Sequence, residues 1–304
     1  MPKPVKVKDY THPFPNWAEL LSACWAEGMD EMDPEALGVQ MAHCHEELSR
    51  TFFPKEEEDR KFTRPSRGSQ CPQMNYFGRV EGVELGEFPH GIQATFALGH
   101  FAHAIGYAAL ASALPSCFTL YSELKADVSN IMPEDGAQSG TIDLVIVTQD
   151  LEEAKRYLAP RVLEETPNCL GDFKTMTGFS WREHRKADYT VLGPDALGYK
   201  GQLCTYWGSN TVQELRGSHG EFAPILIGVN KESPHQGIAP REIPQNVAKE
   251  ALVRATKNFN NDSDVGPWLF NRFGKEVAFF CGASGRRGYC PVYEVCQERR
   301  KAEG

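Results

Sequence analysis

An aspartate and a lysine stand two residues apart in the segment GDFKT, where Asp172 and Lys174 interrupt a short apolar run typical of a strand. On a strand, side chains at positions i and i+2 project from the same face. Asp143 lies earlier, in GTIDLV, where a buried charge is costly unless it is paired or bound to a metal. Hydrolysis of a phosphodiester needs such a set: oxygen ligands for a divalent ion that activates water, and a cation near the developing charge. An isolated D-x-K pair is more often a salt bridge on a solvated strand. The accompanying residues therefore decide between a salt bridge and a catalytic site.

Three other residue types accompany this set. His103 lies in LGHFAH, and His100 one turn earlier competes for any role. A single histidine of this kind is more often a hydrogen-bonded core residue than a ligand. Gln202 and Tyr206, in QLCTY, lie at i and i+4 and share one face of a predicted helix. Each feature is commonplace alone, and their order along the chain is what gives them weight.

In that order, the segments LGHFAH, GTIDLV, GDFKT and QLCTY resemble the RecB-like branch of the PD-(D/E)xK nucleases. This branch includes iron–sulfur exonucleases associated with CRISPR systems and many phage exonucleases. The resemblance spans roughly residues 66–296, and the D-x-K strand followed by a Q-x-x-x-Y helix is its most specific part. It implies a restriction-endonuclease-like fold and a metal-dependent deoxyribonuclease.

The resemblance also implies a metal site. Mg²⁺ or Mn²⁺ would be bound by His103, Asp143, Asp172 and the backbone carbonyl of Phe173. Related enzymes often carry a further acid where Glu123 stands, and this carboxylate either serves a second metal or faces solvent. The cofactor expected from these residues is therefore a hard divalent cation.

The remaining matched residues would act on the substrate. Lys174 would orient or activate the attacking water, which makes Asp143, Asp172 and Lys174 the catalytic set. Gln202 and Tyr206 would help to position the DNA strand. The basic run WREHRK at 181–186 follows the D-x-K strand closely enough to meet phosphates of a bound strand.

Nine cysteines form the second signal, and four of them have a distinctive placement. Iron–sulfur members of the resembled branch carry one cysteine before the nuclease segments and three after them, which corresponds here to Cys71, Cys281, Cys290 and Cys296. Cys281 departs from that pattern because it lies too far before Cys290. A [4Fe–4S] cluster is the expected occupant, structural Zn²⁺ is the competing one, and unconnected thiols are the third reading. The other five cysteines sit in apolar surroundings and are expected to be buried.

Composition limits the class of protein. The chain has 304 residues and a formal net charge of −9, which argues against a protein that coats nucleic acid through bulk positive charge. No apolar run approaches the roughly 20 residues of a membrane helix, and the N-terminal segment has no signal-peptide core. We therefore expect a cytoplasmic protein without a membrane partner.

The elements that must hold these residues follow from periodicity and turn residues. Helices are predicted over 16–52 (two runs, the second capped by Asp33 and Pro34), 93–114, 195–215 and 244–261. Strands are predicted over 117–128, 139–148, 169–177 and 222–230, the first two as an antiparallel pair. This order is α/β, with a mixed central sheet flanked by helices. We expect a helical N-terminal extension over 1–62 and a nuclease domain over 63–304, closed by the cysteine-ligated tail.

The sequence thus predicts a DNA exonuclease that acts on a free end. Two rivals remain: a non-catalytic DNA-binding accessory protein on a nuclease scaffold, and a site-specific endonuclease, which shares the D…D-x-K core. The intact acid, lysine and histidine positions argue against the scaffold, and the Q-x-x-x-Y helix and the cysteine placement argue against the endonuclease.

Overall fold

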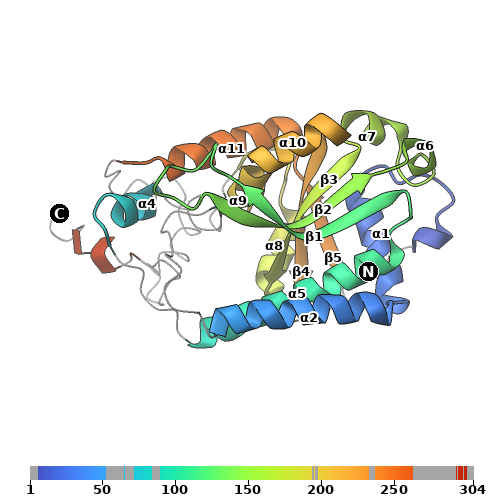
Figure 1. The fold of residues 1–304 in the computed structure, drawn as a ribbon, viewed down its shortest axis with the longest axis horizontal. Helices are drawn as coiled ribbons and strands as arrows, with labels where there is room; N and C mark the ends of the chain where they lie inside the picture. Colours follow the sequence, from blue (N-terminus) through green and yellow to red (C-terminus); the bar gives the residue numbers. More distant parts are fainter. Residues whose placement is uncertain are drawn as a thin grey trace.

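The computed structural model (Figure 1) describes most of the chain, namely residues 6–52, 65, 72–83, 90–193, 195, 198–232, 237–262, 292, 294–296 and 298–299. In chain order the elements are η1 (Val7–Asp9), α1 (Trp17–Asp30), α2 (Pro34–Phe52), α4 (Pro72–Arg79), α5 (His90–Ala113), β1 (Phe118–Asp127), β2 (Ser139–Thr148), α6 (Leu151–Ala154), α7 (Pro160–Glu165), β3 (Asn168–Met176), α8 (Gly178–Lys186), α9 (Tyr199–Trp207), α10 (Asn210–His219), β4 (Phe222–Asn230), β5 (Ile238–Glu242) and α11 (Gln245–Phe259).

The five strands form one open mixed sheet in the order β1-β2-β3-β4-β5. β1, β2 and β3 are consecutive antiparallel neighbours, β3 and β4 are parallel, and β4 and β5 are antiparallel. A parallel pair needs a crossover connection, and α8, α9 and α10 supply it between β3 and β4. β3, which carries the D-x-K residues, is therefore the central strand of the sheet.

Helices cover both faces of this sheet, α1, α2 and α5 on one side and α9, α10 and α11 on the other (Figure 1). Each face has its own apolar core. The first core joins Trp17 and Leu20 of α1 to strand residues such as Phe173, and the second joins α9 and α11 to residues such as Leu170. Phe173 and Leu170 have opposite parity on β3, which is the alternation expected of a strand buried on both faces.

Close packing of α1 on α5 fixes the helix that carries His103. Gly28 lies against the backbone of Ala109, and a Cβ added at Gly28 would come within 1.8 Å of the Ala109 carbonyl oxygen. Only glycine allows the two helices to approach this closely. A Cβ added at Gly106 would lie 3.1 Å from the Phe173 ring, so α5 also packs tightly on the central strand.

Most predicted elements are confirmed, including the α/β class and the antiparallel pair of β1 and β2. The Asp33 cap of α2 is also confirmed, since its carboxylate accepts from the Glu35 N–H at 3.0 Å. The single helix predicted over 195–215 is wrong: it is two helices, because Gly208 ends α9 and the Ser209 hydroxyl accepts from the Val212 N–H to begin α10. The sequence prediction also missed β5 and the helical nature of the WREHRK run in α8.

The domain boundary predicted near residue 62 falls among residues outside the described part. α1, from the predicted extension, shares its core with the sheet and α5. Within the described residues, no helix is both long enough and apolar enough to cross a bilayer. The cytoplasmic location stays a prediction.

Candidate metal and catalytic site

Three carboxylates lie in one row across β1, β2 and β3. The β1–β2 register pairs Ser122 with Leu144 and Leu124 with Ile142, which places Glu123 opposite Asp143. The β2–β3 ladder ends at Leu144 and Gly171, and its next position in register would join Asp143 to Asp172. Glu123, Asp143 and Asp172 therefore stand at the same level on three adjacent strands.

The even-numbered side chains of β1 switch from one side of the sheet to the other at this level. Phe118 and Leu120 pack in the core on the α5 side, whereas Leu124 and Ala126, which have the same parity, pack in the core on the α9 side. Between them Glu123 has a φ of 56°, in the left-handed region that costs a non-glycine residue about 1–2 kcal/mol. The backbone distortion thus coincides with a candidate ligand, as expected of strain stored at a functional site.

β2 changes face at the same level. Ile142 packs with the α9 and α11 core and Leu144 with the α5 core, although the two residues have the same parity. Asp143 lies at this switch, and its carboxylate accepts a hydrogen bond from the Phe173 N–H of β3 at 2.8 Å. This hydrogen bond joins β2 to β3 at the point where their backbone pairing ends.

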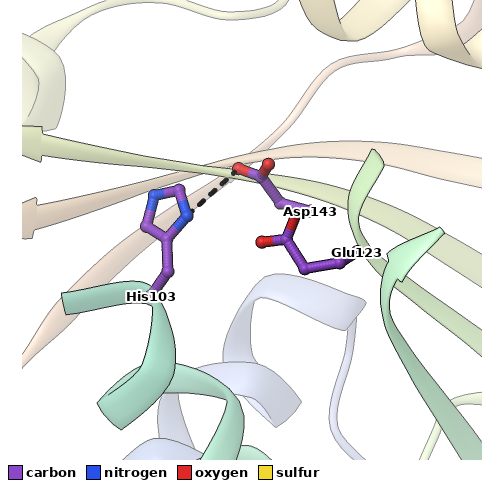
Figure 2. Close-up of side chains that lie close together, drawn as sticks. All are labelled: His103, Glu123 and Asp143. Carbon is purple, nitrogen blue, oxygen red and sulfur yellow. Dashed lines mark ion pairs between the residues drawn. The ribbon is translucent and has the colours of Figure 1, made fainter. Parts of the chain in front are cut away.

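His103 of α5, Glu123 of β1 and Asp143 of β2 converge on one point (Figure 2). One ligand atom from each lies within 4.8 Å of the others. His103 Nδ1 is 4.0 Å from Asp143 Oδ2. The structure therefore places the acid of β1 beside the two other candidate ligands, and Glu123 does not turn to solvent.

The imidazole of His103 is oriented for metal binding. Its Nε2 lies 3.2 Å from the Phe173 carbonyl oxygen, and because a carbonyl only accepts, Nε2 carries the proton. Nδ1 then keeps its lone pair and faces Asp143. Burial, followed by the positive charge of Lys174, lowers the pKa of His103 to about 4, so the ring is neutral at pH 7. In this structure the Phe173 carbonyl accepts the hydrogen bond of His103. Coordination of a metal ion by this carbonyl stays a prediction.

Asp172 and Lys174 form a buried ion pair next to this triad. Lys174 Nζ donates to Asp172 Oδ1 at 2.9 Å and lies 2.8 Å from Oδ2, and their side chains are 16% and 1% exposed. Burial and then the nearby charge of Asp143 raise the pKa of Asp172 to about 6, although Lys174 opposes the shift. Burial lowers the pKa of Lys174, but Asp172 and Asp143 outweigh it and raise that pKa above its usual value. Lys174 is therefore a fixed cation at the site.

The donor set fits a divalent cation. Asp172 Oδ2 is buried and lies 2.8 Å from Lys174 Nζ, its partner in the ion pair, and a carboxylate oxygen has a further lone pair that can bind a metal ion. Burial also raises the pKa of Asp143, although the charge of Lys174 and the hydrogen bond from the Phe173 N–H oppose the shift. Carboxylate oxygens with one neutral imidazole suit Mg²⁺ or Mn²⁺.

Gln202 and Tyr206 of α9 lie on the opposite face of the sheet from α5. Tyr206 is buried, and its ring approaches Gly140 so closely that a Cβ there would lie 2.7 Å from Tyr206 Cε1. Burial, then Asp143 and Asp172, raise the pKa of Tyr206, while a hydrogen bond with Gln202 opposes the shift. Tyr206 thus packs on β2 three residues before Asp143, and contact of the pair with DNA stays a prediction.

Sequence reasoning missed Tyr107, whose hydroxyl donates to Glu123 Oε1 at 3.2 Å. It lies one turn after His103 on the same face of α5, and this i, i+4 spacing was the available signal. Sequence reasoning also missed α2 as a wall of the site. Gln40, His43 and Cys44 line a narrow pocket together with Glu123.

The basic run at 181–186 lies in helix α8, with one exposed side and two buried residues on the other. Trp181 and His184 are buried, and the His184 ring bonds the Tyr189 hydroxyl and the Ala239 carbonyl. Arg182 and Arg185 remain on the exposed face for any contact with phosphates.

Of the four cysteines assigned to a cluster, Cys71, Cys281 and Cys290 lie outside the described residues, and only Cys296 is described. The five other cysteines are buried, as predicted: Cys24, Cys44, Cys117, Cys169 and Cys204.

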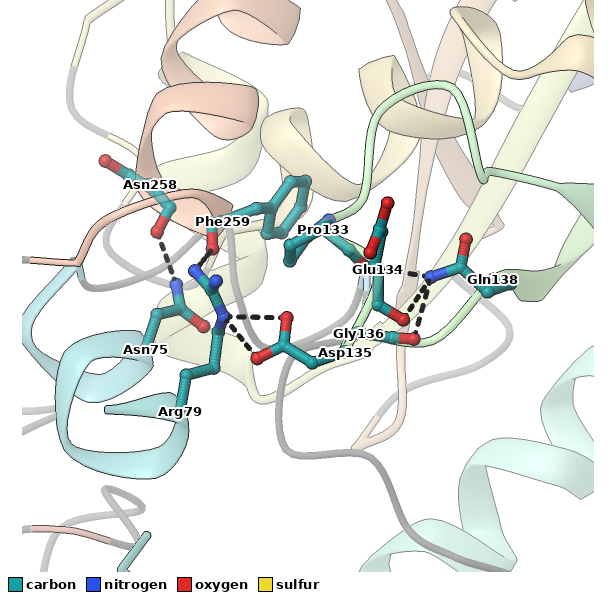
Figure 3. A network of polar contacts seen from close by, with 9 residues as sticks. All are labelled: Asn75, Arg79, Pro133, Glu134, Asp135, Gly136, Gln138, Asn258 and Phe259. Atoms are coloured by element: carbon teal, nitrogen blue, oxygen red, sulfur yellow. Dashed lines mark hydrogen bonds and ion pairs between the residues drawn. The ribbon is translucent and has the colours of Figure 1, made fainter. Parts of the chain in front are cut away.

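Helix α4, which directly follows Cys71, is hydrogen-bonded to the end of α11 (Figure 3). Arg79 of α4 donates to the Phe259 carbonyl at 2.7 Å and pairs with Asp135, and Asn75 donates to the Asn258 carbonyl at 2.8 Å. These bonds satisfy carbonyls that the helix end leaves unpaired.

The described C-terminal residues meet the same helix α4. Arg299 lies over the Phe77 ring at 5.6 Å and pairs with Glu81. Cys296, one turn earlier, is held in a helical turn by its N–H bond to the Val292 carbonyl. The helix that directly follows Cys71 thus contacts Arg299, three residues after Cys296.

Comparisons of the chain with family models, with curated proteins and with solved structures find no match.

Proposed function

We propose that this protein is a metal-dependent deoxyribonuclease that hydrolyses phosphodiester bonds from a DNA end. The observation that carries the proposal is the carboxylate row across β1, β2 and β3, with His103 on one side and Lys174 on the other. Few structural roles need three acids in one row of a buried sheet and a lysine two residues beyond the row, because burial penalises each charge. A metal-dependent phosphoryl transfer site needs this combination.

Each residue has a defined task in this reaction. A bound Mg²⁺ or Mn²⁺ would activate water and neutralise charge on the phosphoryl oxygens. His103, Glu123 and Asp143 would hold the ion, and Asp172 would add a carboxylate oxygen. Lys174 stays protonated beside Asp172, so it acts as a positive charge near the attacking water or the developing negative charge.

Two further parts of the proposal concern the rest of the chain. We assign the sheet and its helices to the restriction-endonuclease-like class, on the sequence resemblance and the position of the D-x-K strand in the sheet. We also propose a four-cysteine [4Fe–4S] site, supported by the contact between α4, which directly follows Cys71, and Arg299, three residues after Cys296. Visible absorption of anaerobically purified protein tests the latter: a colourless, zinc-containing sample would refute the iron–sulfur assignment.

Digestion of end-labelled linear DNA with Mg²⁺ or Mn²⁺, with EDTA as the blank, tests the activity. Lys174→Gln and Asp172→Asn should each lower the rate at least about 100-fold, as expected when a group that stabilises the transition state is lost. Lys155→Gln, which removes an exposed lysine paired with Glu152, is the matched control and should cut normally. Undiminished cleavage by either site variant would refute the assignment.

Closed circular DNA of the same sequence separates the rivals. Resistance of the circle supports the exonuclease, and its cleavage would identify an endonuclease. Binding of linear DNA without any cleavage would identify the non-catalytic scaffold.

A further inference from the structure

Lys174 has a second neighbour besides Asp172. Its Nζ lies 5.4 Å from the centroid of the Tyr199 ring, within the distance at which an ammonium is attracted by an aromatic face. Tyr199 is the first residue of α9, three positions before Gln202, and belongs to none of the motifs considered above. The lysine that serves the reaction is thus held by a carboxylate and by a ring.

The fold fixes the Tyr199 ring from two directions. On one side the ring packs with Met176 and Trp181, next to the end of β3. On the other side the start of α9 is anchored by Asp195, whose carboxylate accepts from the Lys200 N–H at 3.2 Å and the Gly201 N–H at 2.8 Å. A ring placed this way changes position little when its neighbours change charge.

We propose that Tyr199 is the positioning residue for Lys174, and that it keeps the ammonium directed at the reaction centre once Asp172 is engaged by a metal ion. This inference rests on the proposed nuclease function. Lysine carries its charge on a flexible four-carbon chain, so a single partner leaves it several orientations. A carboxylate that shares its oxygens with a divalent ion holds the ammonium less firmly, whereas the ring face is unaffected by the metal.

Three variants test this role. Tyr199→Leu removes the ring, Tyr199→Phe keeps it, and Tyr189→Leu is the matched control. The Tyr189 ring carries the Lys200 amine at 4.8 Å, which is the same kind of contact away from the carboxylate row. We expect Tyr199→Leu to lower kcat about tenfold without raising KM, because the ring would act on the position of the ammonium and not on substrate affinity. Tyr199→Phe and Tyr189→Leu should keep kcat within about twofold.

A readout independent of cleavage accompanies these rates. In protein labelled with ¹³C at the lysine ε carbon, the ε protons of Lys174 should be shifted upfield by the ring in the wild type and in Tyr199→Phe. The shift should be lost in Tyr199→Leu, and Lys174→Arg assigns the resonance. Thermal unfolding of Tyr199→Leu and Tyr189→Leu shows whether loss of a packed ring alone explains any fall in rate.

Wild-type kcat in Tyr199→Leu, or an equal fall in Tyr189→Leu, would overturn the positioning role while leaving the nuclease assignment intact. The same follows if Tyr199→Phe loses as much kcat as Tyr199→Leu. Absence of any cleavage by the wild-type protein would instead refute the proposed function, and the positioning role with it, even where the ring shift is observed.

Discussion

Asp143 and Asp172 occupy the first positions at which the β2–β3 ladder is no longer paired. The last pair joins Leu144 to Gly171, and one more step in register would set the two carboxylates directly opposite each other. Like charges facing each other across a ladder are destabilising. The strands part here, Asp143 bonds the Phe173 N–H, and Asp172 pairs with Lys174. The fork in the sheet is thus the candidate metal site.

Asp172 and His103 should make opposite contributions to the pH dependence of stability. The folded-state pKa of Asp172 is raised from 3.8 to about 6, so its contribution is present below pH 3.8 and is lost as the pH rises through about 6. The folded-state pKa of His103 is lowered from 6.5 to about 4, so its contribution is present above pH 6.5 and is lost as the pH falls through about 4.

Single variants separate these two contributions in urea denaturation with EDTA between pH 4 and 6.5. The stability of the wild type relative to Asp172→Asn should fall as the pH rises. Its stability relative to His103→Gln should rise over the same interval. Two slopes of equal sign would contradict this assignment of the charges.

Lys174→Met should destabilise the metal-free protein by about 3 kcal/mol, because it leaves Asp172 buried without its counter-ion. Mn²⁺ should restore part of the loss by supplying the missing positive charge. The control is the double variant Asp172→Asn/Lys174→Met, in which no buried charge is left at these two positions and Mn²⁺ should restore less. Chemical denaturation with and without Mn²⁺ measures both effects, and equal rescue of the two variants would place the ion elsewhere.

Glu123 combines a strained backbone with a ligand position, and two substitutions distinguish the two roles. A glycine at position 123 adopts the φ of 56° without strain, whereas Glu123→Gln keeps the backbone strain. Glu123→Gly should therefore be the more stable variant by about 1 kcal/mol. Both variants lose the carboxylate, and both should bind Mn²⁺ at least about tenfold more weakly by calorimetry. Unchanged Mn²⁺ affinity would remove Glu123 from the ligand set.

Gly140→Ala tests the contact between β2 and the Q-x-x-x-Y helix. Its Cβ would lie 2.7 Å from Tyr206 Cε1, which should cost about 1–3 kcal/mol of stability and lower the cleavage rate by displacing the ring. Gly217→Ala is the matched control, because a Cβ there meets nothing within 4 Å and alanine favours the helix. Thermal unfolding of the two variants should therefore show shifts of opposite sign.

The sequence alone determined most of the element types and the identity of the candidate site residues. Periodicity and turn residues predicted β1 to β4 and the helices α1, α2, α5 and α11, because apolar alternation and capping act locally. The i, i+2 spacing of Asp172 and Lys174 was enough to predict that both side chains lie on one face of one strand. Their ion pair, which the sequence offered only as the alternative to a catalytic role, is present in the structure.

The tertiary structure alone decided how residues from different strands meet. The backbone switch at Glu123 leaves no mark in local sequence, and Tyr107 and Tyr199 became relevant only when α5 and α9 were placed against the sheet. The alignment of Glu123, Asp143 and Asp172 depends on strand register, which is a property of pairing between segments distant in the chain. The types of the candidate residues are a property of the local sequence. Their proximity depends on strand register and on the packing of the helices against the sheet.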